Sequence, residues 1–255
     1  MQPDPDTTLV AFIGPRHLAG GGDPAWITVP LHRACGWSYG HDPLMPRVIL
    51  SSPNQKALLR LEPDPEGQWW TIHHNATQDR PAWYASFGAR TPVEIIAGFT
   101  DALTAPAAAT TAPADPYEPL ERAGWSPTGT ADGFLSPDGR AMVQRTGSAG
   151  DGPWFATVAL PGLWQAQFDE HTPPHLIAAF TAALADSRPV PRTGSPLRFL
   201  TLYPNLVTRI QRDVPAAQVA SVLEERVRAL AARRAAPPTH PSAPRRPPPN
   251  SGRSR

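Results

Sequence analysis

Two segments of the chain alternate apolar and polar residues with the period of a β-strand. In "AWYASFG" the apolar positions include Trp83 and Phe87, and in "LWQAQFDE" they include Trp164 and Phe168. A period of two places these side chains on one face of a sheet. Three further runs rich in strand formers precede each segment: "RVILS", "KALLRLE" and "QWWTIHHN" before the first, and "GFLS", "RAMVQRT" and "PWFATVAL" before the second. This order predicts two antiparallel four-stranded meanders.

A helix is expected directly after each meander. Thr91 is a favourable N-cap, Pro92 suits the first helical position, and Glu94 completes a capping box. Thr172 and Pro173 repeat this start, with His175 in place of the glutamate. The apolar residues that follow have helical spacing and form two matching stripes: Ile95, Ile96, Phe99 and Leu103, and Leu176, Ile177, Phe180 and Leu184. Each stripe is expected to cover one face of its sheet.

The two halves are an internal repeat. Trp37 and Trp125 lie 88 residues apart, Trp70 and Trp154 lie 84 apart, and Phe99 and Phe180 lie 81 apart. The offset changes only between motifs, so the differences in length fall in loops, where insertions cost little. A short helix ending at Gly36-Trp37 or Gly124-Trp125 is expected to precede each meander.

The segment "SPDG" at residues 136–139 predicts a hairpin corner in the second copy. Pro presets φ near −65°, Asp tolerates the next position, and Gly relaxes the exit of a type I turn. The first copy has "SPNQ", with Asn54 and Gln55 in place of Asp and Gly, which predicts a weaker turn. Ser52 and Ser136 most simply cap their own turns.

These motifs resemble the SPDY domain, a domain of unknown function found in streptomycetes and other actinobacteria, often in two copies. The resemblance covers roughly residues 8 to 186 and rests on these stretches: "PRHLAGGGD", "PLHRACGW" and "PLERAGW", "SPDG", and the helices "TP…IIAGFT" and "TP…LIAAFT". It implies a tandem arrangement and brings no activity with it.

We therefore expect an α+β protein of two tandem repeats, each a four-stranded antiparallel meander with a C-terminal helix packed on it, and an additional C-terminal helix and disordered tail. The predicted division is a first repeat with an N-terminal arm (8–106), an Ala/Pro linker (107–116), a second repeat (117–187), an extension with an amphipathic helix (188–234) and a Pro/Arg-rich tail (235–255). The two repeats are expected to pack as a pseudosymmetric pair.

Charge separates the body of the protein from its C-terminal region. Residues 1–187 carry 10 basic and 19 acidic side chains, whereas residues 188–255 carry 13 basic and 3 acidic ones. Within the basic part, Val219, Val222, Leu223, Val227 and Leu230 would share one face of a helix, and Glu224 would pair with Arg228. That helix either docks on the repeats or binds a partner helix. Six arginines could contact nucleic acid through phosphates: Arg233, Arg234, Arg245, Arg246, Arg253 and Arg255.

Composition narrows the remaining classes. The single cysteine, Cys35, excludes an intramolecular disulfide framework, and the N-terminal residues lack the pattern of a signal peptide, so a cytoplasmic location is expected. No apolar run approaches the roughly 18 residues that span a bilayer, so no membrane association is expected.

Candidate chemistry is sparse. His171 and His175 would not share a helical face, and the adjacent His73 and His74 point to opposite faces of a strand, so neither metal nor cofactor binding is predicted. Cys35 is interpreted as a structural thiol. The glycines of "HLAGGGDPAW" favour a flexible loop over an anion site, because no P-loop lysine follows them. The tryptophans that recur in both copies indicate core packing more than ligand contact.

Without a catalytic constellation, we expect no enzymatic activity and no catalytic residue. The favoured hypothesis is a non-enzymatic interaction module that binds an unknown protein partner through the paired repeats, which predicts an uncovered apolar patch between them. An alternative is weak nucleic-acid binding through the arginine-rich tail. A second alternative is an enzyme whose cleft between the repeats gathers His, Ser or carboxylate side chains from both copies.

Overall fold

The computed structural model describes residues 6–41, 47–62, 68–106, 115–129, 132–147, 151–158, 164–193 and 204–235 of the 255-residue chain. The predicted linker lies largely outside these residues. The predicted disordered tail lies outside them except for Ala235, and so do Arg245, Arg246, Arg253 and Arg255.

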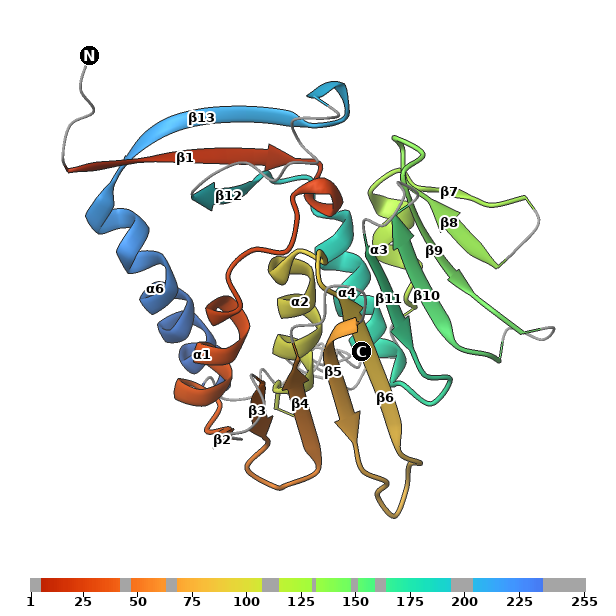
Figure 1. Ribbon diagram of the computed structural model, residues 1–255. Helices are drawn as coiled ribbons and strands as arrows, with labels where there is room; N and C mark the ends of the chain where they lie inside the picture. The colour runs from red at the N-terminus through yellow and green to blue at the C-terminus, as the bar shows by residue number, and fades with distance from the viewer. Residues whose placement is uncertain are drawn as a thin grey trace, which may run out of the picture.

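Each repeat consists of a short helix, an antiparallel meander and a longer helix. Repeat one contains α1 (Ala25–Arg33), β2 (Ser38–His41), β3 (Val48–Ser51), β4 (Ala57–Leu61), β5 (Gln68–His74), β6 (Trp83–Gly88) and α2 (Val93–Leu103). Repeat two contains α3 (Glu118–Arg122), β7 (Ser126–Pro127), β8 (Gly133–Leu135), β9 (Ala141–Arg145), β10 (Trp154–Val158), β11 (Trp164–Phe168) and α4 (Pro174–Ala185). The α+β prediction of two tandem repeats is confirmed (Figure 1).

Each meander has one strand more than the sequence predicts. β2 and β7 pair with the outer strands β3 and β8, so each repeat contributes five strands. Neither "SYGH" nor "SP" alternates apolar and polar residues. These two segments are strands because their backbone groups form hydrogen bonds with the neighbouring strands β3 and β8, and such bonds do not depend on the side-chain pattern.

The repeats share one continuous sheet. Its strand order is β2-β3-β4-β5-β6-β11-β10-β9-β8-β7, so the last strands of the two meanders pair at the centre. In that antiparallel pair Ser86 lies opposite Gln167, and these two residues are equivalent in the 81-residue repeat. A pseudo-twofold axis therefore passes through the Ser86–Gln167 pair.

The core surrounds this axis on the face that the helices cover. Four phenylalanines, two from each repeat, contact one another: Phe87 stacks on Phe180 with ring centroids 5.8 Å apart, and Phe168 stacks on Phe99 at 5.6 Å. All four are fully buried. Helices α2 and α4 approach so closely that a Cβ on Gly98 would lie 2.6 Å from the Cβ of Ala183.

The repeated tryptophans also belong to the core. The side chains of Trp37, Trp70, Trp83, Trp125, Trp154 and Trp164 are all buried, as the repetition indicates. The apolar stripes of both helices face the sheet, where Ile95, Phe99, Ile177 and Phe180 are fully or almost fully buried.

The capping prediction is wrong in detail. α2 and α4 each begin after an N-cap proline that makes no side-chain capping bond. Thr91 is fully buried and its hydroxyl has no hydrogen-bond partner among the described residues, whereas the hydroxyl of Thr172 donates to the carbonyl of Tyr84 in the other repeat. Glu94 binds an arginine instead of completing a capping box.

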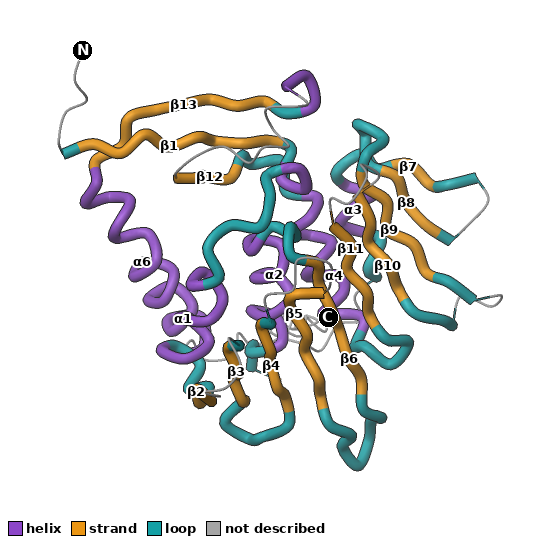
Figure 2. The backbone as a smooth tube through the Cα atoms, in the orientation of Figure 1, coloured by secondary structure: helices purple, strands orange, loops and turns teal. Residues whose placement is uncertain are grey.

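The N-terminal arm and the C-terminal extension form a second sheet that the sequence analysis does not predict. β1 (Thr7–Gly14) lies between β12 (Val190–Thr193) and β13 (Thr208–Pro215), antiparallel to both. Two short 3-10 turns accompany it, η1 (Arg16–Leu18) and η3 (Pro204–Leu206). Figure 2 shows this sheet apart from the large sheet, with α6 (Ala216–Ala235) leading from β13 toward α1.

Candidate functional site

The β3–β4 turn of repeat one and the β8–β9 turn of repeat two have the same hydrogen-bond framework. The hydroxyl of Ser136 accepts the amide of Ala141 at 2.8 Å, and that of Ser52 accepts the amide of Ala57 at the same distance. Both serines also donate to the side chain two residues on, which is Asp138 in repeat two and Asn54 in repeat one. The serines therefore cap their own turns, as predicted.

Residues 16–22, which we call the strap, fill a groove in repeat two. Nε2 of His17 lies 2.9 Å from Oδ2 of Asp138, and the His17 ring meets Trp125 edge-on at 6.5 Å. The indole of Trp164 donates to the carbonyl of His17 at 2.9 Å. His17 is only 4% exposed and Leu18 is fully buried, so the strap is part of the folded core.

Two further carboxylates hold the strap. Arg16 donates to Asp186 at 2.8 Å and to the carbonyl of Ala183 at 3.1 Å. Arg192 of β12 forms a bidentate pair with Glu94, at 2.6 and 2.9 Å, and also donates to the carbonyls of Ala19 and Gly20. Asp138 and Asp186 of repeat two, together with Glu94 of α2 in repeat one, thus form an acidic groove around a basic segment.

The glycines of the strap allow close passage rather than flexibility. The first turn of α2 donates an amide, from Val93, to the carbonyl of Gly21 at 2.7 Å. A Cβ on Gly21 would lie 2.7 Å from the carbonyl oxygen of Ala89, and Gly20 and Gly22 have φ values of 73° and 88°. The interpretation as a flexible loop is wrong, because side chains at these positions would force the strap off α2.

The lowered pKa values of Asp138 and Asp186 favour the charged pairs around the strap. Burial opposes the charge on Asp138, but hydrogen bonds from His17 and Ser136 outweigh it and lower the pKa of Asp138 to about 2. Hydrogen bonds from Arg188 and the charge of Arg16 likewise lower the pKa of Asp186 to about 2, against burial. Both carboxylates are ionised at neutral pH.

Among the described residues, no segment fills the equivalent groove of repeat one. It consists of two pockets that share His74 and Leu103: one of about 270 Å³ is lined by Trp37, Asn54 and Arg234 among others, and one of about 360 Å³ includes Trp83, Ala105 and His175. Trp37, Asn54, Trp83, Ala105 and His175 are the repeat counterparts of Trp125, Asp138, Trp164, Asp186 and Glu94. We call these joined pockets the repeat-one groove.

The repeat-one groove contains two arginines, Arg80 and Arg234, whereas its counterpart contains carboxylates. Its described lining contains Arg80, Arg234, His74 and His175 and no carboxylate. Burial, followed by the charge of Arg80, lowers the pKa of His175. The ring of His74 stacks on Trp83 with centroids 5.2 Å apart, at the position that Val158 occupies in repeat two. Within the described residues the indole of Trp83 makes no hydrogen bond, whereas its counterpart Trp164 binds the strap.

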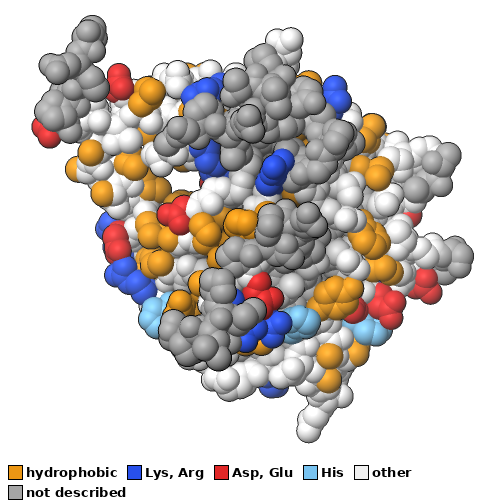
Figure 3. Space-filling model, in the orientation of Figure 1, with side chains coloured by type: hydrophobic (Ala, Val, Ile, Leu, Met, Phe, Trp, Pro, Cys, Tyr) orange, Lys and Arg blue, Asp and Glu red, His pale blue; other side chains and the backbone are white. Residues whose placement is uncertain are grey.

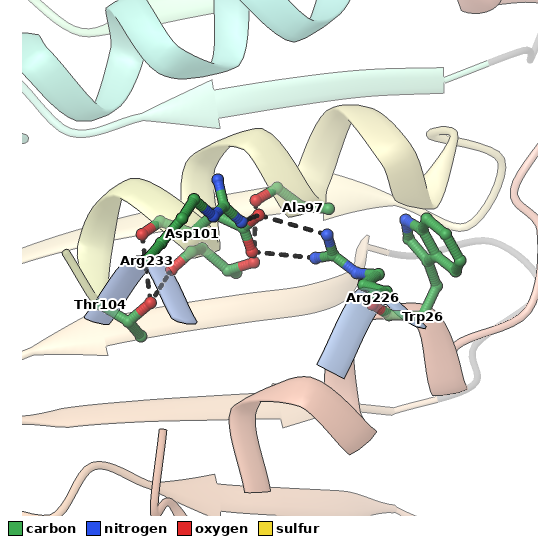
Figure 4. Close-up of polar contacts among 7 residues, drawn as sticks. Trp26, Ala97, Asp101, Thr104, Arg226 and Arg233 are labelled. Carbon is green, nitrogen blue, oxygen red and sulfur yellow. Dashed lines mark hydrogen bonds and ion pairs between the residues drawn. The ribbon is translucent and has the colours of Figure 1, made fainter. Parts of the chain in front are cut away.

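The C-terminal helix docks on repeat one, which settles the alternative left open by the sequence. Val227 and Leu230 are buried, and Asp101 of α2 accepts from Arg226 at 2.9 Å and from Arg233 at 2.8 Å (Figure 4). Arg226 also lies over the Trp26 ring, 4.9 Å from its centroid. Glu224 pairs with Arg33 of α1, so the predicted Glu224–Arg228 pair is not its main contact.

Two of the six arginines assigned to nucleic-acid contact take part in this docking. Arg233 binds Asp101, and Arg234 donates to the carbonyl of Thr104 at 2.6 Å while lining the repeat-one groove. The other four lie outside the described residues.

The remaining candidate residues show no assembled chemistry. Cys35 is buried in the wall of the repeat-one groove, and burial raises the pKa of its thiol against the opposing effects of Thr104 and Arg234. His171 is exposed, and His73 and His74 lie on opposite faces of β5, as predicted. No group of metal-ligating side chains occurs among the described residues.

The surface between the repeats is mixed. The pocket that both repeats line includes Trp83, Leu103 and Leu176 beside His74, Arg80 and His175, so the expected contiguous apolar patch is not what the described residues form there. On the face drawn in Figure 3, hydrophobic side chains are interspersed with charged ones and histidines.

The family comparison agrees with this description. The family model SPDY, a domain of unknown function (DUF317), matches residues 51–109 and 135–190. The two matched segments correspond to two tandem copies of the SPDY domain. The matched segments contain the turns, the inner strands and the long helix of each repeat, while the strap and β1 lie outside them. Searches of curated proteins and of solved structures gave no match. No helix in the described part of the chain combines the length and apolarity needed to cross a membrane.

Sequence reasoning missed the two grooves. A signal was present: the basic pair Arg16-His17 precedes the glycines, and the acidic residues Asp138, Asp186 and Glu94 are each replaced in the other repeat. Its meaning depends on the pairing of β6 with β11, which no local pattern specifies.

Proposed function

We propose that this protein is a non-enzymatic interaction module that binds a peptide segment of a partner protein in the repeat-one groove. The observation that supports the proposal is the strap. A groove of the same frame already holds a seven-residue segment in repeat two, with its backbone bound by Trp164 and Val93.

The lining of the repeat-one groove suits an extended segment. Trp83 offers an indole N–H at the position where Trp164 binds a peptide carbonyl, and the flat stack of His74 on Trp83 provides a contact surface. Pockets of about 270 and 360 Å³ are large enough for side chains. A segment that enters these pockets would lose its hydration and gain contacts equivalent to those that the strap makes in repeat two.

The same lining argues for binding rather than catalysis. Ser52 uses its hydroxyl within its own turn, and the Cys35 thiol, with its pKa raised by burial, contacts Thr104 and Arg234 instead of an imidazole. A nucleophile needs a base within hydrogen-bond reach, and in the described lining neither His74 nor His175 holds that position. We therefore propose no reaction for this groove.

Selection of a displayed random-peptide library against the full chain tests the proposal. Enriched peptides are expected to bind the purified protein and to lose at least tenfold in affinity with Ala105→Trp, which places an indole in the groove. Gln165→Trp is the matched control, because Gln165 is exposed on the opposite face of the sheet. Peptides that bind both variants equally, or a selection without enrichment, would contradict the proposed groove.

A further inference from the structure

We infer that the segment bound by the repeat-one groove is acidic. The inference rests on the proposed function and adds the chemistry of the partner. Its basis is the reversal of charge between two grooves that share one frame.

In repeat two, the groove and its occupant have opposite charges. Arg16 and His17 of the strap meet Asp186 and Asp138, at 2.8 and 2.9 Å. Glu94 holds the remainder of the strap through Arg192. Every carboxylate of this groove is therefore engaged by a basic side chain that belongs to the strap or clamps it.

In repeat one, all three acidic positions have changed. Asn54 replaces Asp138, Ala105 replaces Asp186, and His175 replaces Glu94. A basic strap would find no counter-charge there and would face Arg80 and Arg234. Unpaired like charges weaken association, so a second copy's strap is a poor occupant.

The basic side chains of the repeat-one groove lie where an acidic occupant could reach them. A carboxylate at the position equivalent to His17 would enter the pocket of Asn54 and Arg234, and one at the position equivalent to Arg16 would enter the pocket of Arg80 and His175. Arg80 is exposed and donates no described hydrogen bond, so it is available to a ligand. An acidic segment thus satisfies both pockets at once.

The test uses two labelled peptides derived from the strap itself. One is the natural sequence "GPRHLAGGGD" of residues 14–23, and the other carries Arg16→Glu and His17→Glu. Fluorescence polarisation with the full chain is expected to show at least tenfold tighter binding of the acidic peptide. The difference should shrink as salt is raised, because the added attraction is between charges.

Charge reversal of the groove provides the decisive comparison. A chain with Asn54→Asp, Ala105→Asp and His175→Glu carries the acidic set of repeat two and is expected to prefer the natural peptide. Arg80→Glu is a second variant that replaces only an exposed side chain and should weaken the acidic peptide at least threefold. Near-ultraviolet circular dichroism of each variant establishes that the fold is retained.

The possible failures are distinguishable. Equal affinity for both peptides, abolished by Ala105→Trp, would refute the acidic preference and leave the peptide groove standing. If neither peptide binds, the composition of the library-selected peptides decides, and neutral or basic sequences would refute the inference. A chain that binds the acidic peptide only after removal of residues 236–255 would identify its own C-terminal segment as the occupant, against a partner protein.

Discussion

Repeat one and repeat two are the same frame used differently. Both place a capped turn, three buried tryptophans and a phenylalanine pair at equivalent positions around the Ser86–Gln167 axis. Repeat two closes its groove with the strap. In repeat one no described segment fills the groove, and Asp101, which is Ala182 in repeat two, holds α6. A duplicated fold therefore needs few substitutions to give its two halves different contacts.

The largest effects are expected where the repeats are most alike. Phe99→Ala and Phe180→Ala each remove a fully buried ring beside the pseudo-axis, and each should lower the free energy of unfolding by about 3–5 kcal/mol. Urea denaturation measures both. If the two losses of unfolding free energy differ by more than about twofold, the core is not energetically symmetric.

A smaller effect is expected where helices α2 and α4 meet near the pseudo-twofold axis. Gly98→Ala should destabilise by about 1–3 kcal/mol although alanine favours helix, because its Cβ would meet Ala183 and the carbonyl of Ala179. The reciprocal Ala179→Gly is expected to cost about 1 kcal/mol through backbone entropy. Thermal unfolding compares the two, and a stabilised Gly98→Ala chain would contradict the close approach of α2 and α4.

The strap contributes a pH-dependent difference between the repeats. Asp138→Asn should lower the free energy of unfolding by about 1 kcal/mol at pH 7, because the change removes a charged hydrogen bond with His17. The expected loss is small because Asp138 is partly exposed. Since folding lowers the pKa of Asp138 from 3.8 to about 2, its contribution is complete above the higher value and is lost as pH falls toward the lower.

Urea denaturation between pH 2 and 7 checks this expectation. The curves of the wild-type and Asp138→Asn chains should converge at the acidic end. The counterpart change Asn54→Asp in repeat one serves as control and should show no matching loss, because no strap histidine faces position 54. Parallel curves over the whole range would contradict the assigned role of the His17–Asp138 pair.

The smallest effect concerns the turns. Gln55 has a φ of 58°, in the region that Gly139 occupies at 68° in repeat two. Gln55→Gly should stabilise the protein by up to about 1 kcal/mol, because the strain of a left-handed residue exceeds the added entropy of glycine. Differential scanning calorimetry would register a small rise in Tm, and an unchanged or lower Tm would show that the hydrogen bond from the Gln55 side chain to Ser52 compensates.

Much of the frame was predictable because it depends on local patterns. The alternation in the inner strands, the apolar stripes of both long helices and the Ser-Pro turns are each defined by residues only a few positions apart in the sequence. The outermost strands were not, since "SYGH" and "SP" carry no alternation and owe their state to the neighbouring strand. The predicted cap at Thr91 was wrong because α2 begins at Val93, after Pro92, and the predicted capping box was wrong because Glu94 binds Arg192, 98 residues away.

The sequence by itself determined that this protein is a duplicated sheet-and-helix unit with a buried aromatic core, because repetition and periodicity record which side chains leave water. Only the tertiary structure decided that the two meanders join through β6 and β11, that the glycines pass tightly over α2, and that the strap fills one groove while no described segment fills the other. Those features depend on contacts between segments far apart in the sequence: Gly21 and Val93 are separated by 72 residues, Ser86 and Gln167 by 81, and His17 and Asp138 by 121, and chain folding alone brings such segments together.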